Sequence, residues 1–269
     1  MPRTDEYEGI IAEMMGITTS DGEINAYYAR PLGSGPFPAV VLFHHRPGWD
    51  DWYRYATRLF ATRGYAAISP NLYFRFGHGD HDDVAARANA EGGPSDDQVV
   101  ADATAAMRFL RAQPSVSDRV GLFGTCSGAR HAYLTACRVP DVSAVVDCWG
   151  GRIVTPASDL TPQQPVAPID YTKDLAAPVL GIFGNEDSSP SPSDVDALEE
   201  ALRAHGKAYE FHRFDGAGHG FFYHDRPANY RAEQALDGWE LVWDFLRRTL
   251  HRTGTDRRGG GIAHVHDDH

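Results

Sequence analysis

A cysteine lies between two glycines in the segment Val-Gly-Leu-Phe-Gly-Thr-Cys-Ser-Gly-Ala-Arg at residues 120–130. The pattern Gly-x-Cys-x-Gly follows an apolar run and precedes a helical one, which predicts a nucleophile elbow, a sharp strand-to-helix turn with the central side chain at its tip. Gly124 and Gly128 suit such a turn because a residue without Cβ tolerates close backbone approach and unusual dihedral angles. The sequence therefore predicts covalent acyl chemistry at the thiol of Cys126.

A thiol nucleophile needs a base, and the base needs an acceptor that fixes its tautomer. Asp187 follows an apolar strand-like run, and His219 lies in the glycine-rich segment 216–220. The chain order Cys, Asp, His is that of α/β-hydrolase triads. We therefore expect Cys126 as nucleophile, His219 as base and Asp187, rather than the adjacent Glu186, as the acid that orients His219.

Acyl transfer also needs two hydrogen-bond donors for the developing oxyanion. The backbone amide of Ser127, directly after the nucleophile, is the natural first donor. The second is expected from the turn that follows the first buried parallel strand, His-His-Arg-Pro-Gly at residues 44–48. Pro47 has no amide hydrogen, which leaves His45 or Arg46, and we favour the amide of Arg46.

Composition limits the classes of partner. The 269-residue chain has a formal net charge of −12, which argues against nucleic acid or an anionic membrane and favours a small-molecule substrate. The sequence has neither an apolar run of about 18 residues nor an apolar N-terminal segment, so we expect a cytoplasmic protein that does not enter a membrane. Three cysteines without scaffold spacing suggest free thiols.

No cofactor or metal is expected. The segments 77–83 and 264–269 are rich in His and Asp, but neither has a recognisable zinc-ligand spacing. Both are expected to be solvated loop or tail.

The elements that must position these residues alternate between strand and helix. Apolar runs and turn signals predict strands over 38–45, 65–70, 119–123, 143–149, 179–183 and 209–214, after an antiparallel pair within 9–31. Helical periodicity predicts helices over 51–63, 97–113, 127–139, 193–205 and 228–250. This alternation indicates an α/β fold with a mostly parallel central sheet, helices on both faces and functional residues at the carboxyl ends of strands.

We expect one domain over residues 1–252. The polar segment 74–98 and the Pro-rich segment 150–177 show no sustained period, so they are predicted to be irregular and to border the site. The His/Asp-rich residues 253–269 are predicted to be a disordered tail.

The chain resembles the dienelactone hydrolase (carboxymethylenebutenolidase-like) family, a cysteine-dependent branch of the α/β-hydrolases, over about residues 10–250. The resemblance rests on the segments 40–48 and 69–75, the Cys126 elbow, and the segments 184–187 and 216–220. It implies the α/β-hydrolase fold, a triad of Cys126, Asp187 and His219, and hydrolysis of a lactone or ester through a thioester acyl-enzyme.

Several positions depart from the family pattern. His45 stands where the family usually has a glutamate that contacts the resting thiol, so His45 is either a second base or a polar strand-end residue satisfied by backbone. Arg75 matches a family arginine that binds a substrate carboxylate, but Tyr223 stands where a second one is expected. Together with Phe222, Tyr223 would favour a larger or less charged ligand. Arg130 is expected to point toward solvent.

These observations predict a hydrolase of a small lactone or ester, either monomer or homodimer. Two alternatives stay open at this point. One is a non-hydrolytic isomerase, lyase or cyclase that uses the same Cys-His site, and the other is a catalytically silent ligand-binding or thiol-sensing protein.

Overall fold

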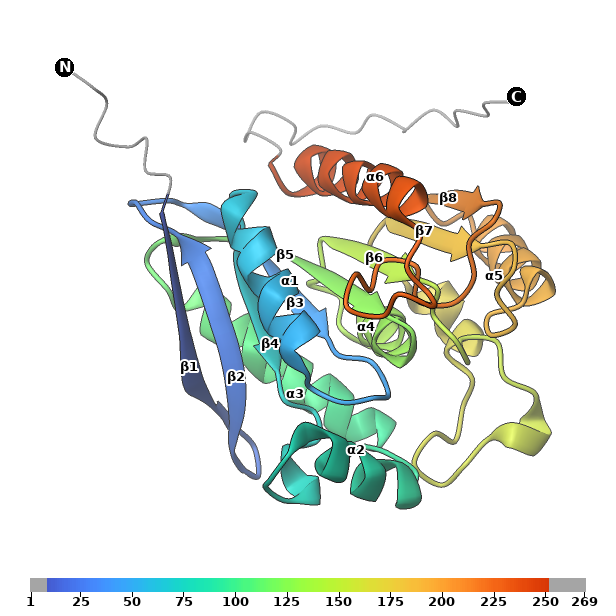
Figure 1. Cartoon of the computed structure of the whole chain (residues 1–269), viewed down its shortest axis with the longest axis horizontal. Coiled ribbons are helices and arrows are strands. Elements are labelled where there is room, and N and C mark those ends of the chain that lie inside the picture. The colour runs from blue at the N-terminus through green and yellow to red at the C-terminus, as the bar shows by residue number, and fades with distance from the viewer. Residues whose placement is uncertain (1–8, 252–269) are drawn as a thin grey trace.

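A computed structural model describes residues 9–251, in which eight strands form one sheet in the order β1-β2-β4-β3-β5-β6-β7-β8 (Figure 1). β1 pairs antiparallel with β2 and β2 antiparallel with β4, whereas all other neighbours are parallel. The strands are β1 (Ile10–Thr19), β2 (Gly22–Pro31), β3 (Phe37–Phe43), β4 (Ala66–Pro70), β5 (Val116–Thr125), β6 (Ala144–Cys148), β7 (Val179–Gly184) and β8 (Tyr209–Phe214). The predicted α/β class and antiparallel opening are confirmed.

Helices cover both faces of this sheet (Figure 1). α1 and α6 pack on one face, and α2, α3, α4 and α5 contribute to the core on the other. Their bounds are α1 (Asp51–Thr62), α2 (His81–Ala90), α3 (Asp96–Arg111), α4 (Ser127–Arg138), α5 (Pro192–Ala204) and α6 (Ala232–Leu250). The sequence of β3 is apolar throughout because both of its faces are buried. Val40 and Leu42 lie in the core on one side of the sheet, and Val41 and Phe43 lie in the core on the other.

The prediction that residues 74–98 lack regular structure was wrong. This segment holds the short 3-10 helix η1 (Phe74–Phe76), all of α2 and the start of α3. The Asp80 side chain caps α2 by accepting from the Asp82 N–H, and the helix buries Val84 and Ala88 on one face. Its buried residues are few and small, so the periodic signal is weak.

Residues 150–177 are irregular apart from the 3-10 helices η2 (Ala157–Asp159) and η3 (Pro168–Asp174). The last helix begins at Ala232 rather than at residue 228. The predicted tail, 253–269, lies outside the described residues.

The strand order determines where a site can form. From β3 the chain moves to β4 on one side, and later enters β5 on the other side of β3. The connections that leave β3 and β5 therefore diverge, and ligands of open α/β sheets bind at such a switch point, beyond the carboxyl ends of the strands. β3 ends just before His44, and β5 ends just before Cys126.

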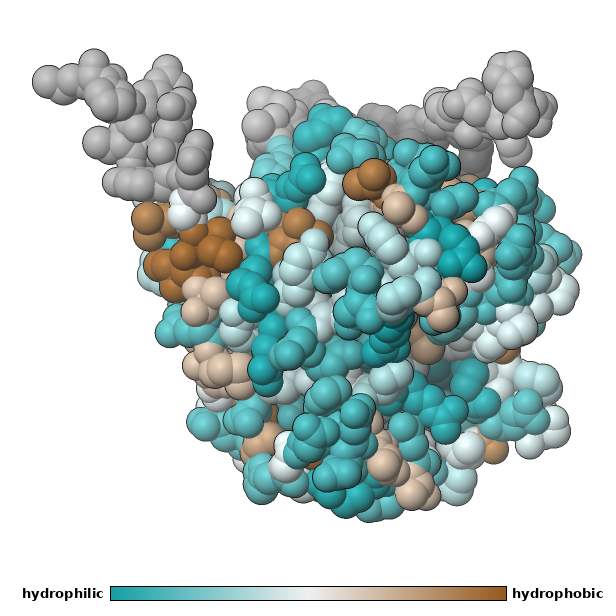
Figure 2. All heavy atoms as spheres, viewed as in Figure 1, coloured by the Kyte–Doolittle hydropathy of each residue, from teal (hydrophilic) through white to brown (hydrophobic). Residues whose placement is uncertain are grey.

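The surface seen in Figure 2 is mostly hydrophilic. Brown, hydrophobic spheres gather beside the start of β1, where Leu32 is exposed and its N–H is hydrogen-bonded to the carbonyl of Gly9. Within residues 9–251, no helix combines the length and apolar character that crossing a bilayer requires.

Candidate active site

Cys126 joins β5 to α4 in a strained backbone conformation, with φ 55° and ψ −127°. A non-glycine residue rarely adopts a positive φ, so surrounding contacts must hold it there. The Cys126 N–H donates to the Cys148 carbonyl at 3.0 Å. A Cβ on Gly124 would lie 2.2 Å from the Gly128 oxygen, and one on Gly128 would lie 2.0 Å from the Phe43 oxygen. The two glycines thus allow the end of β5 to approach the start of α4, and the start of α4 to approach the end of β3.

The segments after β7 and β8 bring Asp187 and His219 together. Nδ1 of His219 lies 2.8 Å from Oδ2 of Asp187, which is buried. The other oxygen of Asp187 accepts from the Ser189 N–H at 2.9 Å, and the Asn229 side chain donates to the His219 carbonyl at 2.8 Å. The carboxylate therefore fixes the ring with Nδ1 protonated and leaves Nε2 for the thiol.

Charge favours an ion pair between the thiol and this imidazole. Burial alone would raise the pKa of Cys126, but His219 and the backbone N–H groups of Ser127 and Arg46 lower it below the usual value. Burial lowers the pKa of His219, yet Asp187 and the Cys126 sulfur together raise it to about 10. Each group thus favours the charged form of the other.

The same two amides are the donors predicted for the oxyanion. Both lower the pKa of the Cys126 thiol, one from Ser127 at the start of α4 and the other from Arg46 in the turn after β3. An oxyanion hole needs donors aimed at the carbonyl oxygen of the substrate, so the assignment of these two amides to that role stays a prediction.

His45 is turned toward a carboxylate. It is buried, and its Nε2 lies 2.8 Å from Oδ2 of Asp50, which also accepts from Arg226 at 2.9 Å. Burial lowers the pKa of His45 despite Asp50. The alternative of a strand-end residue satisfied by backbone was wrong, because the partner is the side chain of Asp50. Sequence reasoning missed Asp50 and Arg226; Asp50 stands at the N-cap of α1 and Arg226 in an irregular loop.

Arg75 does not present a free cation. Its Nε donates to Asp21 at 2.9 Å and its Nη1 donates to Asp102 at 2.9 Å, with a further contact to Thr19. Burial lowers the pKa of Arg75, but the two carboxylates raise it above its usual value. The expectation that Arg75 binds a substrate carboxylate is corrected: the guanidinium joins β1, η1 and α3.

The two aromatic residues after His219 are part of the core beside the elbow. Phe222 is 2% exposed and packs edge-on against Trp149, with ring centroids 5.0 Å apart. Tyr223 is also buried, and its hydroxyl lies 2.6 Å from Oγ1 of Thr125, the residue before Cys126. Neither ring is exposed to a ligand, so their assignment to substrate binding is corrected to support of the elbow.

Arg130 also departs from expectation. It is 2% exposed and forms a two-pronged ion pair with Asp96, at 2.6 and 3.2 Å. The pair ties the elbow helix α4 to the start of α3, and this long-range partner is why the prediction of a solvent-facing side chain was wrong.

Cys137 and Cys148 are buried, and burial raises the pKa of both thiols, that of Cys137 to about 12. Of the three thiols, only that of Cys126 has a lowered pKa.

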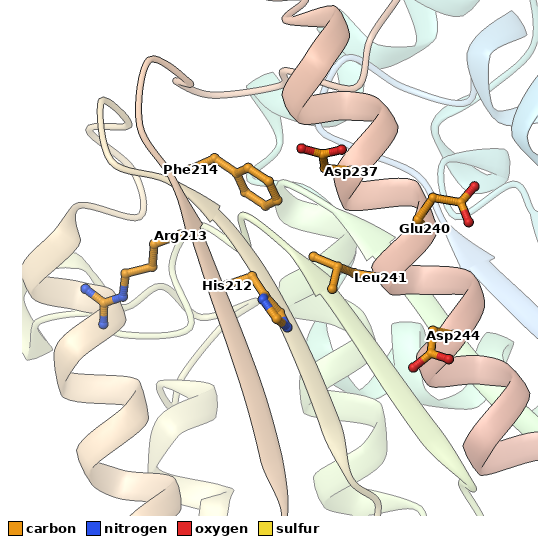
Figure 3. A pocket seen from close by; sticks show the side chains of 7 residues that line it. All are labelled: His212, Arg213, Phe214, Asp237, Glu240, Leu241 and Asp244. Atoms are coloured by element: carbon orange, nitrogen blue, oxygen red, sulfur yellow. The ribbon is translucent and has the colours of Figure 1, made fainter. Parts of the chain in front are cut away.

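A surface groove of about 520 Å³ lies between β8 and α6 (Figure 3). Its lining residues are His212, Arg213, Phe214, Asp237, Glu240, Leu241 and Asp244. The carboxylates come from α6, and none of the candidate catalytic side chains takes part. The site is therefore assigned from the chemistry of Cys126 rather than from the size of a hollow. Within residues 9–251, no three metal-ligating side chains are grouped.

Known proteins resemble this chain in sequence and in fold. Residues 24–250 match the model of the "Dienelactone hydrolase family". A Methylorubrum extorquens protein named "Putative carboxymethylenebutenolidase" is 37% identical over 248 residues, covering 89% of this chain and 82% of its own. A Bradyrhizobium protein named "Probable 2-oxo-3-(5-oxofuran-2-ylidene)propanoate lactonase" is 28% identical, covering 89% and 95%. A crystal structure of a "Putative Dienelactone Hydrolase" from Klebsiella pneumoniae superposes with TM-score 0.81 at 30% identity, covering 89% of this chain and 99% of that one.

Proposed function

The chain belongs to the dienelactone hydrolase family, and from this premise we propose that it hydrolyses a small lactone or ester with Cys126 as nucleophile. Family membership makes it a hydrolase of lactone or ester bonds. The observation that carries the finer proposal is the thiol at the tip of the strained elbow, whose pKa is lowered by His219 and by two backbone amides.

Acylation begins from the thiolate. The Cys126 sulfur attacks the carbonyl carbon, the new C–S bond forms, and the carbonyl π electrons move to the oxygen, which the amides of Ser127 and Arg46 stabilise. When the tetrahedral intermediate collapses, the C–O bond to the leaving group breaks. His219 gives its Nε2 proton to the departing alkoxide, and Asp187 holds the ring throughout. The product of this half-reaction is a thioester; in a lactone the alcohol stays attached to the acyl group.

Deacylation uses the same groups in reverse. Neutral His219 takes a proton from water at Nε2, and the resulting hydroxide attacks the thioester carbonyl. Collapse breaks the C–S bond, restores the thiolate beside the imidazolium and releases the carboxylic acid. The ion pair at Cys126 and His219 is therefore both the start and the end of the cycle.

The pairing of two arginines argues for an uncharged acyl group. Arg75 is paired with two carboxylates and Arg226 with one. An arginine already held by carboxylate oxygens has little left to offer a substrate carboxylate. We therefore assign neutral lactones and esters as the preferred class. The Methylorubrum and Bradyrhizobium relatives are both named as enzymes of lactones, which supports the reaction type.

The test is a screen of neutral lactones and aryl esters with Cys126→Ala and Cys137→Ala measured beside the unsubstituted protein. Cys137 is a buried thiol outside the site, so its variant controls for general loss of a cysteine. Turnover should disappear only in Cys126→Ala, and reaction in heavy-oxygen water should place one solvent oxygen in the acid. Full turnover by Cys126→Ala would refute the nucleophile, and product without solvent oxygen would favour an isomerase or cyclase.

A further inference from the structure

His44, the first residue after β3, uses both nitrogens of its ring. Its Nε2 lies 3.1 Å from the backbone nitrogen of Leu72, and its Nδ1 lies 3.0 Å from the backbone oxygen of His45. The residue is 1% exposed, with the ring edge-on against Tyr73 at 4.6 Å between centroids. Neither the nucleophile nor the base contacts this side chain through a hydrogen bond within the described residues, so its role must be indirect.

These partners settle the tautomer of His44. A backbone N–H can only donate, so Nε2 accepts from Leu72 and carries no hydrogen. A carbonyl oxygen can only accept, so Nδ1 carries the hydrogen and donates to His45. Burial lowers the pKa of His44 to about 4, even though the His45 carbonyl raises it. The ring is thus neutral at physiological pH, with one donor and one acceptor, both satisfied.

The contact with His45 fixes one peptide plane. The His45 carbonyl also accepts from the Gly48 N–H at 3.0 Å, so two donors hold it on the same side. The carbonyl of a trans peptide and the N–H of the next residue point in opposite directions. The Arg46 N–H is therefore directed away from the side on which His44 donates, and this N–H is among the groups that lower the pKa of Cys126.

The next peptide is held separately. The Arg46 carbonyl accepts from the Tyr73 hydroxyl at 3.2 Å and from the Asn89 side chain at 3.3 Å. Tyr73 thus contacts both parts of the turn: its ring packs on His44, and its hydroxyl donates to the Arg46 carbonyl. The turn after β3 is thus fixed on both sides of the Arg46 amide.

We infer that His44 is a positioning residue for the oxyanion hole: by donating to the His45 carbonyl, it holds the Arg46 amide aimed at the reacting carbonyl oxygen. The inference rests on the proposed function, since an oxyanion forms only in acyl transfer. His44 does not touch the substrate. It acts through the peptide bond between His45 and Arg46.

Two conservative variants separate the two contacts of the ring. In His44→Asn the side-chain amide reaches the position of Nδ1 and can still donate to the His45 carbonyl, but the acceptor for Leu72 is lost. In His44→Gln the amide reaches the position of Nε2, where its oxygen accepts from Leu72 and the donor to His45 is lost. The exposed residue His205 supplies a control, His205→Gln.

Two reactions of the same thiol then distinguish positioning from general damage. Acylation by a p-nitrophenyl ester passes through an oxyanion, whereas alkylation by iodoacetamide does not. Removing one oxyanion donor typically costs about 100- to 1,000-fold, and misaiming it should cost less, so His44→Gln is expected to slow acylation about 10- to 100-fold. Its alkylation rate should stay within about twofold of the unsubstituted protein, and His44→Asn should lose less acylation than His44→Gln.

Three results would overturn the inference. In the first, both variants lose acylation equally. In the second, acylation and alkylation fall together, which is the pattern of a structural defect. In the third, the unsubstituted protein alkylates at Cys126 but forms no acyl adduct with any ester. The third refutes the proposed function as well, whereas the first two leave it standing.

Discussion

Removal of His219 should change the pH at which Cys126 becomes reactive. The imidazolium next to the sulfur is what lowers the pKa of Cys126 against burial, which alone would raise it. In His219→Ala only the Ser127 and Arg46 amides still oppose burial. The pKa of the thiol should therefore return to its ordinary value of about 8.5 or above.

The size of the effect follows from the thiolate fraction. At about pH 6 a thiol of pKa about 8.5 is only about 0.3% ionised, whereas the lower pKa of the native thiol leaves a larger fraction ionised. The more basic thiolate of the variant is a better nucleophile, with a Brønsted coefficient of about 0.4–0.5, which offsets part of the loss. We expect alkylation by uncharged iodoacetamide to be about 10- to 100-fold slower in His219→Ala at about pH 6. Near pH 10, where both thiols are ionised, the variant should alkylate at least as fast as the native protein.

The measurement is a stopped-time alkylation series from about pH 5 to pH 10, followed by intact mass. Cys137 and Cys148 do not interfere, because burial raises the pKa of each. His205→Ala, an exposed histidine, serves as the control and should follow the native profile. Superimposable profiles for His219→Ala and the native protein would refute the ion pair, and with it the assignment of His219 as the base.

Three further substitutions test how the site is supported. Asp96→Asn leaves the buried Arg130 without a countercharge and should cost about 3–5 kcal/mol in the free energy of unfolding, measured with urea; a loss under about 1 kcal/mol would contradict the pairing. Gly128→Ala places a methyl group 2.0 Å from a β3 carbonyl oxygen, so the elbow must shift, with a loss of about 1–3 kcal/mol and of most turnover; an active, fully stable variant would contradict the elbow geometry. Asp147 is buried, and burial raises its pKa to about 7 although the Gly150 N–H lowers it, so the unfolded state loses the proton first as the pH rises. The free energy of unfolding, measured with urea, should thus fall by up to about 4 kcal/mol between about pH 4 and pH 8 because of this group. Asp147→Asn should lack that decline. An equal dependence on pH in both proteins would exclude the raised pKa of Asp147.

The sequence reveals the parts of this site that are encoded by local spacing. Gly124, Cys126 and Gly128 lie within one turn, and the turn geometry demands those residue types in that order. Asp187 and His219 each follow a recognisable strand, and parallel strands bring their carboxyl ends to one edge. Thus the candidate triad and the two amides could be proposed without coordinates.

The errors concern side chains whose partners lie far along the chain. Arg75 looked like a free cation because Asp21 and Asp102 lie on elements remote in sequence. Arg130 looked exposed because its partner is on another helix. A sequence gives the charge of a side chain, but only the packed fold shows whether a carboxylate already neutralises it.

The role of His44 was equally beyond sequence reasoning. It depends on the Leu72 N–H after β4 and on the orientation of a peptide plane, neither of which has a residue-type signature. His45 and Asp50 are only five residues apart in sequence, so their pairing could have been predicted from the sequence.

Detection of an acyl group on Cys126 tests the central proposal most directly. The protein is mixed with a slowly hydrolysed aryl ester, quenched in acid within the first turnover, and measured by intact mass and peptide mapping. We expect one acyl mass per chain, placed on the peptide that contains Cys126 and absent from Cys126→Ala. Turnover of the ester with no adduct on Cys126, or an adduct on another residue, would contradict it.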